Sequence, residues 1–168
     1  DDWQGNIIAN DFRANRVVRF AISDDGAGFA AKLLPDLIKS TDRAFRPVDV
    51  KMGPDGALYI ADWSNPIIQH GEVDFRDPRR DHEHGRIWRV TAKNRSLNRP
   101  PDLSKAGNAA LLDELLSPNS YERFQASRTL TERGAAILKD LDAWTKRQTD
   151  EKSRLRALWM YQAVDHAE

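Results

Sequence analysis

The sequence has no cysteine among its 168 residues. Disulfide bonds, thiolate chemistry and covalent attachment of haem are therefore excluded within these residues. It also lacks a run of eighteen or more apolar residues and a signal-peptide pattern, so no segment is expected to span a membrane. Lysine and arginine number 26 and are balanced by 26 aspartates and glutamates, which leaves no net charge to attract nucleic acid or an anionic membrane.

Two segments about fifty residues apart share one pattern of short apolar runs, glycines and charges. Residues 5–12 (GNIIANDF) align with residues 56–63 (GALYIADW), and residues 15–20 (NRVVRF) align with residues 85–90 (GRIWRV). The Pro-Asp-Gly sequence that ends at Gly56 predicts a tight turn, because glycine accepts a positive φ there. An internal repeat of short strands and glycine turns is typical of β-propeller blades.

The predicted fold is a partial, antiparallel all-β propeller followed by an all-α region. We assign residues 1–95 to C-terminal propeller blades and residues 108–168 to HEAT-like helical repeats. Residues 96–107 are expected to be a linker, because their polar, proline-containing composition fits neither a strand nor a helix. Since a propeller needs about four to eight blades to close, we expect the chain to be an internal piece of a longer protein.

Within the blades, strands are expected near residues 48–52, 57–61 and 86–91, and an outer strand at residues 29–34. Residues 35–43 read as a linking segment with a helical turn at 36–39.

In the second region, apolar residues recur at helical spacing. Asn119 is placed as the first cap of a helix, three residues before Glu122, and Gly134 as its stop. Residues 123–126 (RFQA) recur thirty-one positions later as RLRA, which suggests paired helices. Four aromatic residues are expected to lie in the core of this region, namely Tyr121, Phe124, Trp144 and Trp159.

The second blade differs from the first by an insertion. Five positions separate Asp11 from Arg16, whereas twenty-four separate Asp62 from Arg86. The difference places about nineteen extra residues, roughly 65–84, in the second blade, and a loop of this length in a compact blade is more often functional or disordered than neutral.

The insertion has the highest density of polar side chains suited to chemistry. We single out His82 and His84 as candidate catalytic residues, because an imidazole with a pKa near 6.5 suits a general base in alcohol oxidation. The candidate residues for binding substrate or cofactor are Asp62, Trp63, His70, Arg76, Arg79 and Arg80.

Three interpretations of the insertion remain open. Arginine and aspartate side chains could brace the loop through bidentate pairs, with Arg76, Arg79 and Arg80 meeting nearby aspartates. The loop could instead bind a sugar-like substrate or cofactor, with arginines holding its acidic groups and Trp63 stacking on it. A metal site is the third, although no complete four-ligand spacing is present. For Asp62, a structural role is the alternative to ligand binding, because this residue holds the same blade position as Asp11.

Several segments resemble the membrane-bound dehydrogenases of planctomycete-type bacteria. The specific one is residues 74–82 (DFRDPRRDH), with residues 45–50 (FRPVDV) and 84–89 (HGRIWR) in support. The resemblance implies a propeller similar to that of the quinoprotein sugar and sorbosone dehydrogenases, then HEAT-like helices, then a c-type cytochrome domain. The sequence departs from that pattern in extent, since it has no Cys-x-x-Cys-His motif.

The resemblance implies an extracytoplasmic protein, periplasmic or membrane-associated, that oxidises a sugar or alcohol. The parent would use pyrroloquinoline quinone, calcium and a c-type haem that lies outside this chain, and the chain alone is expected to be inactive and to hold no cofactor. Its partners would be the small-molecule substrate and the remaining blades and cytochrome domain of the same parent. The alternative is a non-catalytic module that binds carbohydrate or protein.

Overall fold

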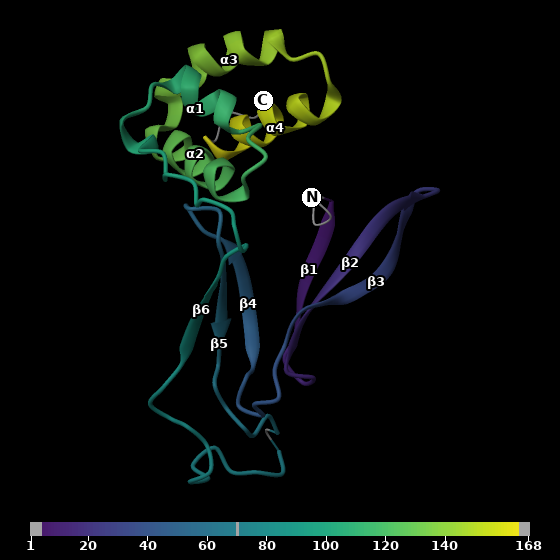
Figure 1. The fold of residues 1–168 in the computed structure, drawn as a ribbon. Coiled ribbons are helices and arrows are strands. Elements are labelled where there is room, and N and C mark those ends of the chain that lie inside the picture. Colours follow the sequence, from purple (N-terminus) through teal and green to yellow (C-terminus); the bar gives the residue numbers. More distant parts are fainter. Residues whose placement is uncertain (1–4, 70, 165–168) are drawn as a thin grey trace. The chain divides into compact units, whose positions relative to one another are not determined.

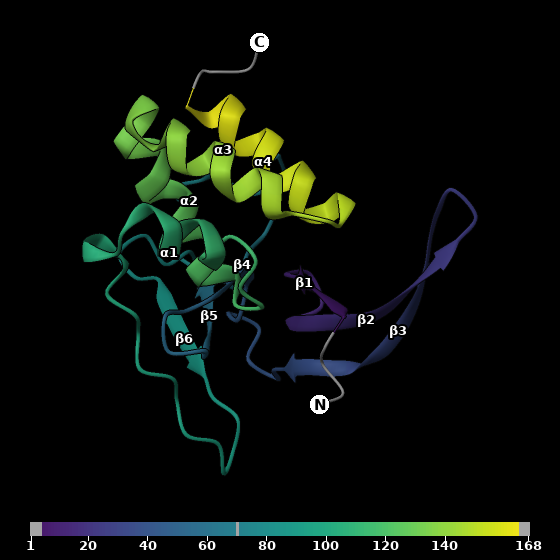
Figure 2. The ribbon, with the colours of Figure 1, turned by 90° about the horizontal axis from the view of Figure 1, so that it is seen from above.

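The computed structural model describes residues 5–69 and 71–164, which form antiparallel β-sheets followed by α-helices (Figures 1 and 2). The chain divides into two compact units. The first comprises the described residues up to Lys51 together with Ala57–Lys93, and the second comprises Met52–Gly56 together with the residues from Asn94 onward. The described residues form two small three-stranded sheets in place of a closed propeller.

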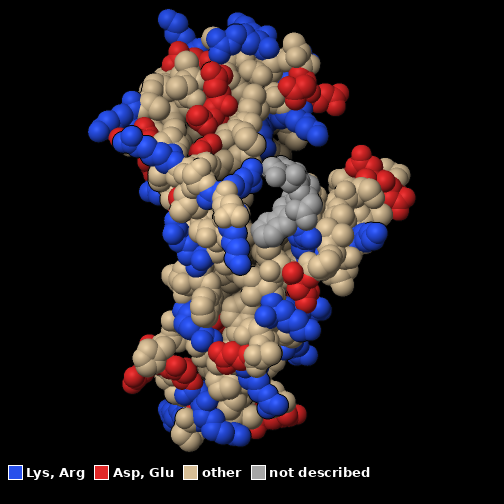
Figure 3. Space-filling model, viewed as in Figure 1, with Lys and Arg blue, Asp and Glu red and all other residues tan. Residues whose placement is uncertain are grey.

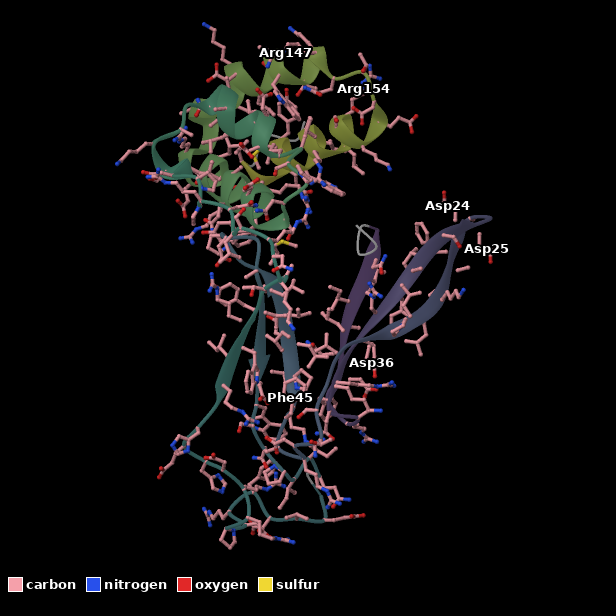
Figure 4. All side chains as sticks on the ribbon, in the orientation of Figure 1. Asp24, Asp25, Asp36, Phe45, Arg147 and Arg154 are labelled. Atoms are coloured by element: carbon pink, nitrogen blue, oxygen red, sulfur yellow. The ribbon has the colours of Figure 1, made fainter. Side chains whose placement is uncertain are left out.

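The first sheet has the strand order β1 (Asn6–Asp11), β2 (Arg16–Asp25) and β3 (Gly28–Lys39). All its strands pair antiparallel, and Asp11 lies opposite Arg16 where β1 passes into β2. The β2–β3 hairpin ends at a turn beside Asp24 and Asp25, which Figure 4 labels at its tip.

The prediction of a helical turn at residues 36–39 is wrong, because β3 continues through them to Lys39. The register moves from Arg19 opposite Leu34 to Val17 opposite Ile38, so β3 contains a bulge between these pairs. Pro35 falls inside the bulge, where its missing N–H interrupts no regular ladder. The edge position of β3 further allows the proline in a strand.

The second sheet has the order β4 (Pro47–Met52), β5 (Leu58–Asp62) and β6 (Arg86–Val90). The predicted turn between β4 and β5 is present, with a hydrogen bond from Gly56 N to Gly53 O over 3.1 Å and a φ of 78° at Gly56. A small core of Val17, Phe45 and Ile60 joins residues of the two sheets, and Figure 4 labels Phe45 on the segment just before β4.

The second unit contains α1 (Asn108–Glu114), α2 (Ser120–Arg133), α3 (Leu138–Arg147) and α4 (Glu151–Ala163). Short 3₁₀ helices precede α1 at Leu103–Lys105 and α3 at Gly134–Ile137. The core of the unit is formed by ten buried apolar residues, namely Leu111, Leu112, Leu115, Ala126, Leu130, Ile137, Leu141, Trp144, Ala157 and Met160.

The predicted caps of α2 are confirmed. The Asn119 side chain accepts a hydrogen bond from Tyr121 N over 3.0 Å, and Gly134 ends the helix with a φ of 59°. Glu122 does not return to the backbone of the cap as a capping box requires. Its carboxylate instead accepts hydrogen bonds from the Asn119 amide and the Ser117 hydroxyl.

The thirty-one-residue sequence repeat corresponds to a structural repeat of α2 and α4. Asp150 caps α4 through Ser153 N as Asn119 caps α2. Arg123 donates to the carbonyl of the residue six positions earlier over 2.6 Å, and Arg154 does the same over 3.1 Å. The equivalent alanines of the two helices, at positions 126 and 157, are both buried. Equivalent local interactions therefore recur in the two helices, although Asn119 accepts from the residue two positions ahead and Asp150 from the residue three positions ahead.

The expected aromatic core is only partly correct. Trp144 is fully buried, and Tyr121 is half-buried, but Phe124 and Trp159 are 63% and 54% exposed. In α4 the buried residues are Ser153, Ala157 and Met160, which follow one another at i, i+4 and i+7. This stripe consists of two small residues and a flexible methionine, while the larger apolar side chains of α4 are exposed.

Acidic and basic side chains are mixed on the face shown in Figure 3, in agreement with the balanced composition. Among the residues that the structure describes, no helix combines the length and the apolar character that crossing a membrane requires.

Candidate functional site

The insertion begins and ends at a closed pair of strands. Asp62, at the end of β5, lies opposite Arg86, at the start of β6, and Arg86 Nε donates to Asp62 Oδ2 over 2.8 Å. The same carboxylate accepts hydrogen bonds from Trp88 Nε1 over 2.8 Å, from Arg46 N over 2.7 Å and from Ser64 N over 2.9 Å. The buried carboxylate of Asp62 thus accepts four hydrogen bonds. They come from residues on both sides of the insertion and hold its two ends together.

These donors also set the charge state of Asp62. Burial by itself raises the pKa of the carboxyl, but the hydrogen bonds from Trp88 and two backbone N–H groups, with the positive charge of Arg86, outweigh it. The pKa therefore lies below its usual range, and the carboxylate is ionised at neutral pH.

The buried guanidinium of Arg46 connects the insertion to the first sheet. Its Nη1 donates to the carbonyls of Phe12 and Arg13 over 2.8 and 3.2 Å, and its Nε and Nη2 donate to those of Asn65 and Pro66 over 3.0 and 3.2 Å. Burial lowers the pKa of this guanidinium, although the charges of nearby carboxylates partly oppose the shift. The first residues of the insertion are therefore held against the β1–β2 loop.

Arg80 organises the interior of the insertion. It is only 6% exposed, and its guanidinium donates to four backbone carbonyls of the loop. The acceptors are the carbonyl oxygens of Asp74 (3.0 Å), Ile67 (3.1 Å), Val73 (3.1 Å) and Gln69, the last at a short distance. The charged group also lies over the ring of Phe75, at 5.5 Å from its centroid. The Arg80 side chain thus donates hydrogen bonds to backbone carbonyls that have no partner in a strand or helix.

Three aspartates shape the rest of the loop by accepting hydrogen bonds from backbone N–H groups two or three residues ahead. Asp74 accepts from residue 76 over 2.7 Å, Asp77 from residue 79 over 2.9 Å, and Asp81 from residues 83 and 84, each over 3.0 Å. Such turns are local, which explains why aspartate recurs at short intervals in this stretch.

The predicted bracing by Arg–Asp pairs is therefore only partly correct. Arg79 does form a bidentate pair with Asp77, at 2.8 Å from Nε to Oδ1 and 2.7 Å from Nη2 to Oδ2. This pair holds the pKa of Asp77 well below its usual range. Arg80 uses carbonyl acceptors instead, and the carboxylate of Asp81 contacts His84. The side chain of Arg76 is exposed, and no pair with Asp74 is formed.

The loop folds around a pocket of about 410 Å³. We call it the loop pocket, and it is lined by Trp63, Asn65, Phe75, Arg80, Asp81, His82, Glu83 and His84. Two aromatic rings, two imidazoles and two carboxylates thus come together within one segment of the chain. This combination supplies hydrogen-bond donors and acceptors beside apolar surfaces.

The two histidines differ in their surroundings. His84 Nδ1 lies 3.1 and 3.2 Å from the two carboxylate oxygens of Asp81, whereas His82 Nε2 lies 3.4 Å from the carbonyl oxygen of Asp77. An imidazole that donates from Nδ1 to a carboxylate keeps Nε2 free to accept a proton. The hydrogen bonds from Glu83 N and His84 N keep the pKa of Asp81 below its usual range, so it is a charged partner.

The other predicted site residues lie in different places. Trp63 and Arg80 line the loop pocket, but the hydrogen bonds that Arg80 donates go to four carbonyls of the protein's own backbone. Asp62 borders a second, mainly apolar hollow that also touches Trp63. Arg76 and Arg79 do not line the loop pocket, and His70 lies outside the described residues.

Sequence reasoning did not single out Asn65, Phe75 or Glu83 as site residues. Phe75 stands in the arginine-rich run and is 61% exposed, yet its ring forms one wall of the pocket. Asn65 is buried and accepts from Ile67 N over 3.1 Å. The Asn-Pro dipeptide at position 65 was the available signal, because it favours a turn.

Among residues 5–69 and 71–164, no group of three or more histidine, cysteine, aspartate or glutamate side chains is arranged to hold a metal ion.

Comparison with known families gives one match. The profile of a domain of unknown function (DUF7133) matches residues 1–94, which contain both sheets and the loop pocket. No curated protein and no solved structure is detectably similar to the chain.

Proposed function

The chain belongs to the DUF7133 family, and we propose that its loop pocket binds a sugar or a similar polyhydroxylated alcohol. We further propose that the chain is part of an extracytoplasmic, dehydrogenase-like protein that oxidises this ligand. Its sheets would be two blades of a propeller, and its helices the first members of a HEAT-like array. The resemblance of residues 74–82 and their neighbours to membrane-bound dehydrogenases supports this wider proposal.

The composition of the loop pocket carries the binding proposal. Sugars present apolar C–H faces beside hydroxyl groups, and sites for such ligands combine aromatic surfaces with a few oriented polar groups. Trp63 and Phe75 supply the aromatic surfaces, and Asp81 and Glu83 supply carboxylate acceptors for hydroxyl donors. The volume of about 410 Å³ suits a small-molecule ligand.

The Asp81–His84 pair gives the pocket a group that can accept a proton. With Nδ1 directed at Asp81, the Nε2 atom of His84 is available to a ligand hydroxyl. The carboxylate would stabilise the imidazolium that forms when the hydroxyl proton is transferred. This is the assignment that we favour among the histidines, and His82 would contribute a hydrogen bond rather than the base.

The pocket does not fit pyrroloquinoline quinone. That cofactor carries three carboxylates and needs cationic partners, but the loop pocket contains Asp81 and Glu83 and a single arginine. Arg80 directs its donors at four carbonyls of its own loop, so it does not neutralise a carboxylate. The described residues also hold no cluster suited to calcium. We therefore assign the quinone, calcium and the c-type haem that would receive electrons to other parts of the parent.

A second candidate function follows from the same observation. A pocket suited to a polyhydroxylated ligand but not to the cofactor also fits a non-catalytic module that binds carbohydrate while redox chemistry occurs elsewhere. The two candidates share the ligand and differ in whether the proton acceptor on His84 is used.

Isothermal titration calorimetry of the chain against a panel of neutral monosaccharides and sugar alcohols tests the binding proposal. At least one member should bind with a Kd of about 1 mM or tighter, which corresponds to about 4 kcal/mol. Trp63→Ala should weaken that binding, whereas Trp144→Phe, in the core of the helical unit, should not. Absence of binding across the panel would contradict the proposal. With the parent protein, the better ligand should drive dye reduction that His84→Gln abolishes if the site is catalytic, and leaves unchanged if it only binds.

A further inference from the structure

A smaller pocket lies within the helical unit. Its volume is about 80 Å³, and it is formed by residues of α2 and α4 together with Leu115. We call it the arginine pocket, and it is lined by Leu115, Arg123, Ser127, Arg156, Trp159 and Met160. No acidic side chain is among the residues that line it.

Two guanidinium groups of like charge converge on this pocket. Arg123 is half-buried, and its Nη1 donates to Ser117 O over 2.6 Å. Burial and the charge of Arg156 both lower the pKa of Arg123, so the two cations repel one another at close range. Within the described residues, Arg156 forms no ion pair with a carboxylate. An anion between the two guanidinium groups would remove this repulsion.

Other arginines of the same unit have their interactions satisfied within the protein. Arg128 pairs with Glu132 over 2.8 Å, and Arg133 donates to Asn108 Oδ1 and to Ala106 O, each over 2.7 Å. The structural repeat also sets Arg156 apart, because the equivalent position in α2 is occupied by the uncharged Gln125. The helix of this repeat therefore does not need a positive charge at the position of Arg156.

The surface next to the pocket is apolar. Trp159 lines the pocket and is 54% exposed, and Leu155 lies one helical turn before it with 43% of its surface exposed. Leu158, on the same helix, is also exposed. A ligand that places an anionic group between the arginines would thus have an apolar surface available for its neighbouring group.

We propose that the arginine pocket binds a carboxylate side chain of an acidic peptide segment in a partner protein, with an apolar neighbour of that carboxylate packed on Trp159 and Leu155. The size of the pocket fits this occupant. At about 80 Å³ it is far smaller than the loop pocket of about 410 Å³, so it suits a compact anionic group such as a carboxylate. Ser127 adds a hydroxyl that can donate to the second carboxylate oxygen. This site is independent of the function proposed for the loop pocket.

Fluorescence anisotropy with a fluorescein-labelled peptide of alternating glutamate and leucine tests the proposal on the full chain. A second peptide with glutamine in place of glutamate is the ligand control. We expect the acidic peptide to bind at least tenfold more tightly than the glutamine peptide, and its binding to weaken as salt is raised. Equal binding of the two peptides, or no binding of either, would overturn the proposal.

The variant Arg156→Gln places in α4 the residue that α2 carries at the equivalent position, so the helix is expected to tolerate it. It should weaken binding of the acidic peptide about tenfold, which is the size of effect expected for one charge-assisted hydrogen bond. Arg147→Gln removes the same charge from the last residue of α3, which Figure 4 labels and which does not line the pocket, and should change the affinity less than twofold. Equal losses in the two variants would show nonspecific attraction and overturn the proposal. Binding of inorganic phosphate with no binding of the peptide would overturn the peptide assignment.

Discussion

Arg86 donates to the carboxylate of Asp62 from the strand directly opposite, over 2.8 Å. Arg16 and Asp11 form the same cross-strand pair in the first sheet over 3.0 Å, although only five positions separate them in the sequence. The second sheet therefore accommodates the whole insertion without altering the strand ends. This explains how a long polar loop can be added to one repeat while the surrounding sheet is kept.

Asp62→Ala should destabilise the sheet unit far more than Asp11→Ala. Removing a buried carboxylate leaves Arg86, Trp88 and two backbone N–H groups without their acceptor, which costs about 3 kcal/mol. The Asp11 pair is about one-third exposed on both sides, so solvent screens it and its loss should cost far less. Differential scanning calorimetry of both variants measures the difference. Equal destabilisation would show that Asp62 has no special structural role.

The contribution of Asp62 to stability should depend on pH in a defined direction. Its folded pKa lies below the unfolded value of about 3.9, so the folded state releases this proton more readily than the unfolded state. The stabilisation is therefore complete above about pH 4 and is lost as the pH falls through the lowered folded pKa. The free energy of unfolding of the wild type and of Asp62→Asn, measured in urea from neutral to acidic pH, should differ most at neutral pH and converge in acid. A gap that widens on acidification would contradict the assigned shift.

Arg80→Lys should loosen the insertion without unfolding the sheets. A lysine ammonium is a compact charge and cannot reach the four carbonyls that the planar guanidinium of Arg80 gathers. Hydrogen exchange of peptides covering residues 65–84 should accelerate at least tenfold, while exchange in β2 stays unchanged. Arg79→Lys is the matched control, since the Arg79 side chain is largely exposed, and it should have little effect. If hydrogen exchange in the loop is unchanged in Arg80→Lys, Arg80 does not organise the insertion.

Local signals in the sequence predicted the fold best. Asn119 and Gly134 act through their own backbone neighbourhood, so their capping roles could be read from residue type and spacing. Trp159 was misplaced because its i, i+3 and i+4 spacing with leucines marks a helical stripe without showing which stripe is buried. The buried stripe of α4 consists of small or flexible residues, and that choice depends on the neighbouring helices.

The candidate site was predictable only as a region. The density of histidines and charged residues identified the insertion, but it did not show that Arg80 binds backbone carbonyls while Arg79 binds a carboxylate. Every residue has a backbone carbonyl, so the sequence does not indicate which carbonyls accept these hydrogen bonds. The pairing of His84 rather than His82 with Asp81 likewise depends on the path of the loop.

The segment 1–95 expressed alone should be unstable or prone to aggregation. Its sheets end in edge strands, and large apolar side chains such as Phe29 and Ile87 are 74% and 76% exposed. Size-exclusion chromatography followed by thermal denaturation tests this expectation. A monomer with a cooperative melt would show that the two sheets need no further neighbours.

The double variant His82→Ala, His84→Ala tests most directly whether the insertion is a binding site rather than a self-bracing loop. Both side chains are exposed, so their loss should cost no more than about 0.5 kcal/mol of stability. The melting temperature and the affinity for the tightest-binding member of the sugar panel should be measured on the same preparation, and the parent protein's turnover of that ligand alongside. We predict a melting temperature close to that of the wild type and a loss of affinity or turnover of about tenfold or more. Unchanged affinity and turnover in the double variant would contradict the account.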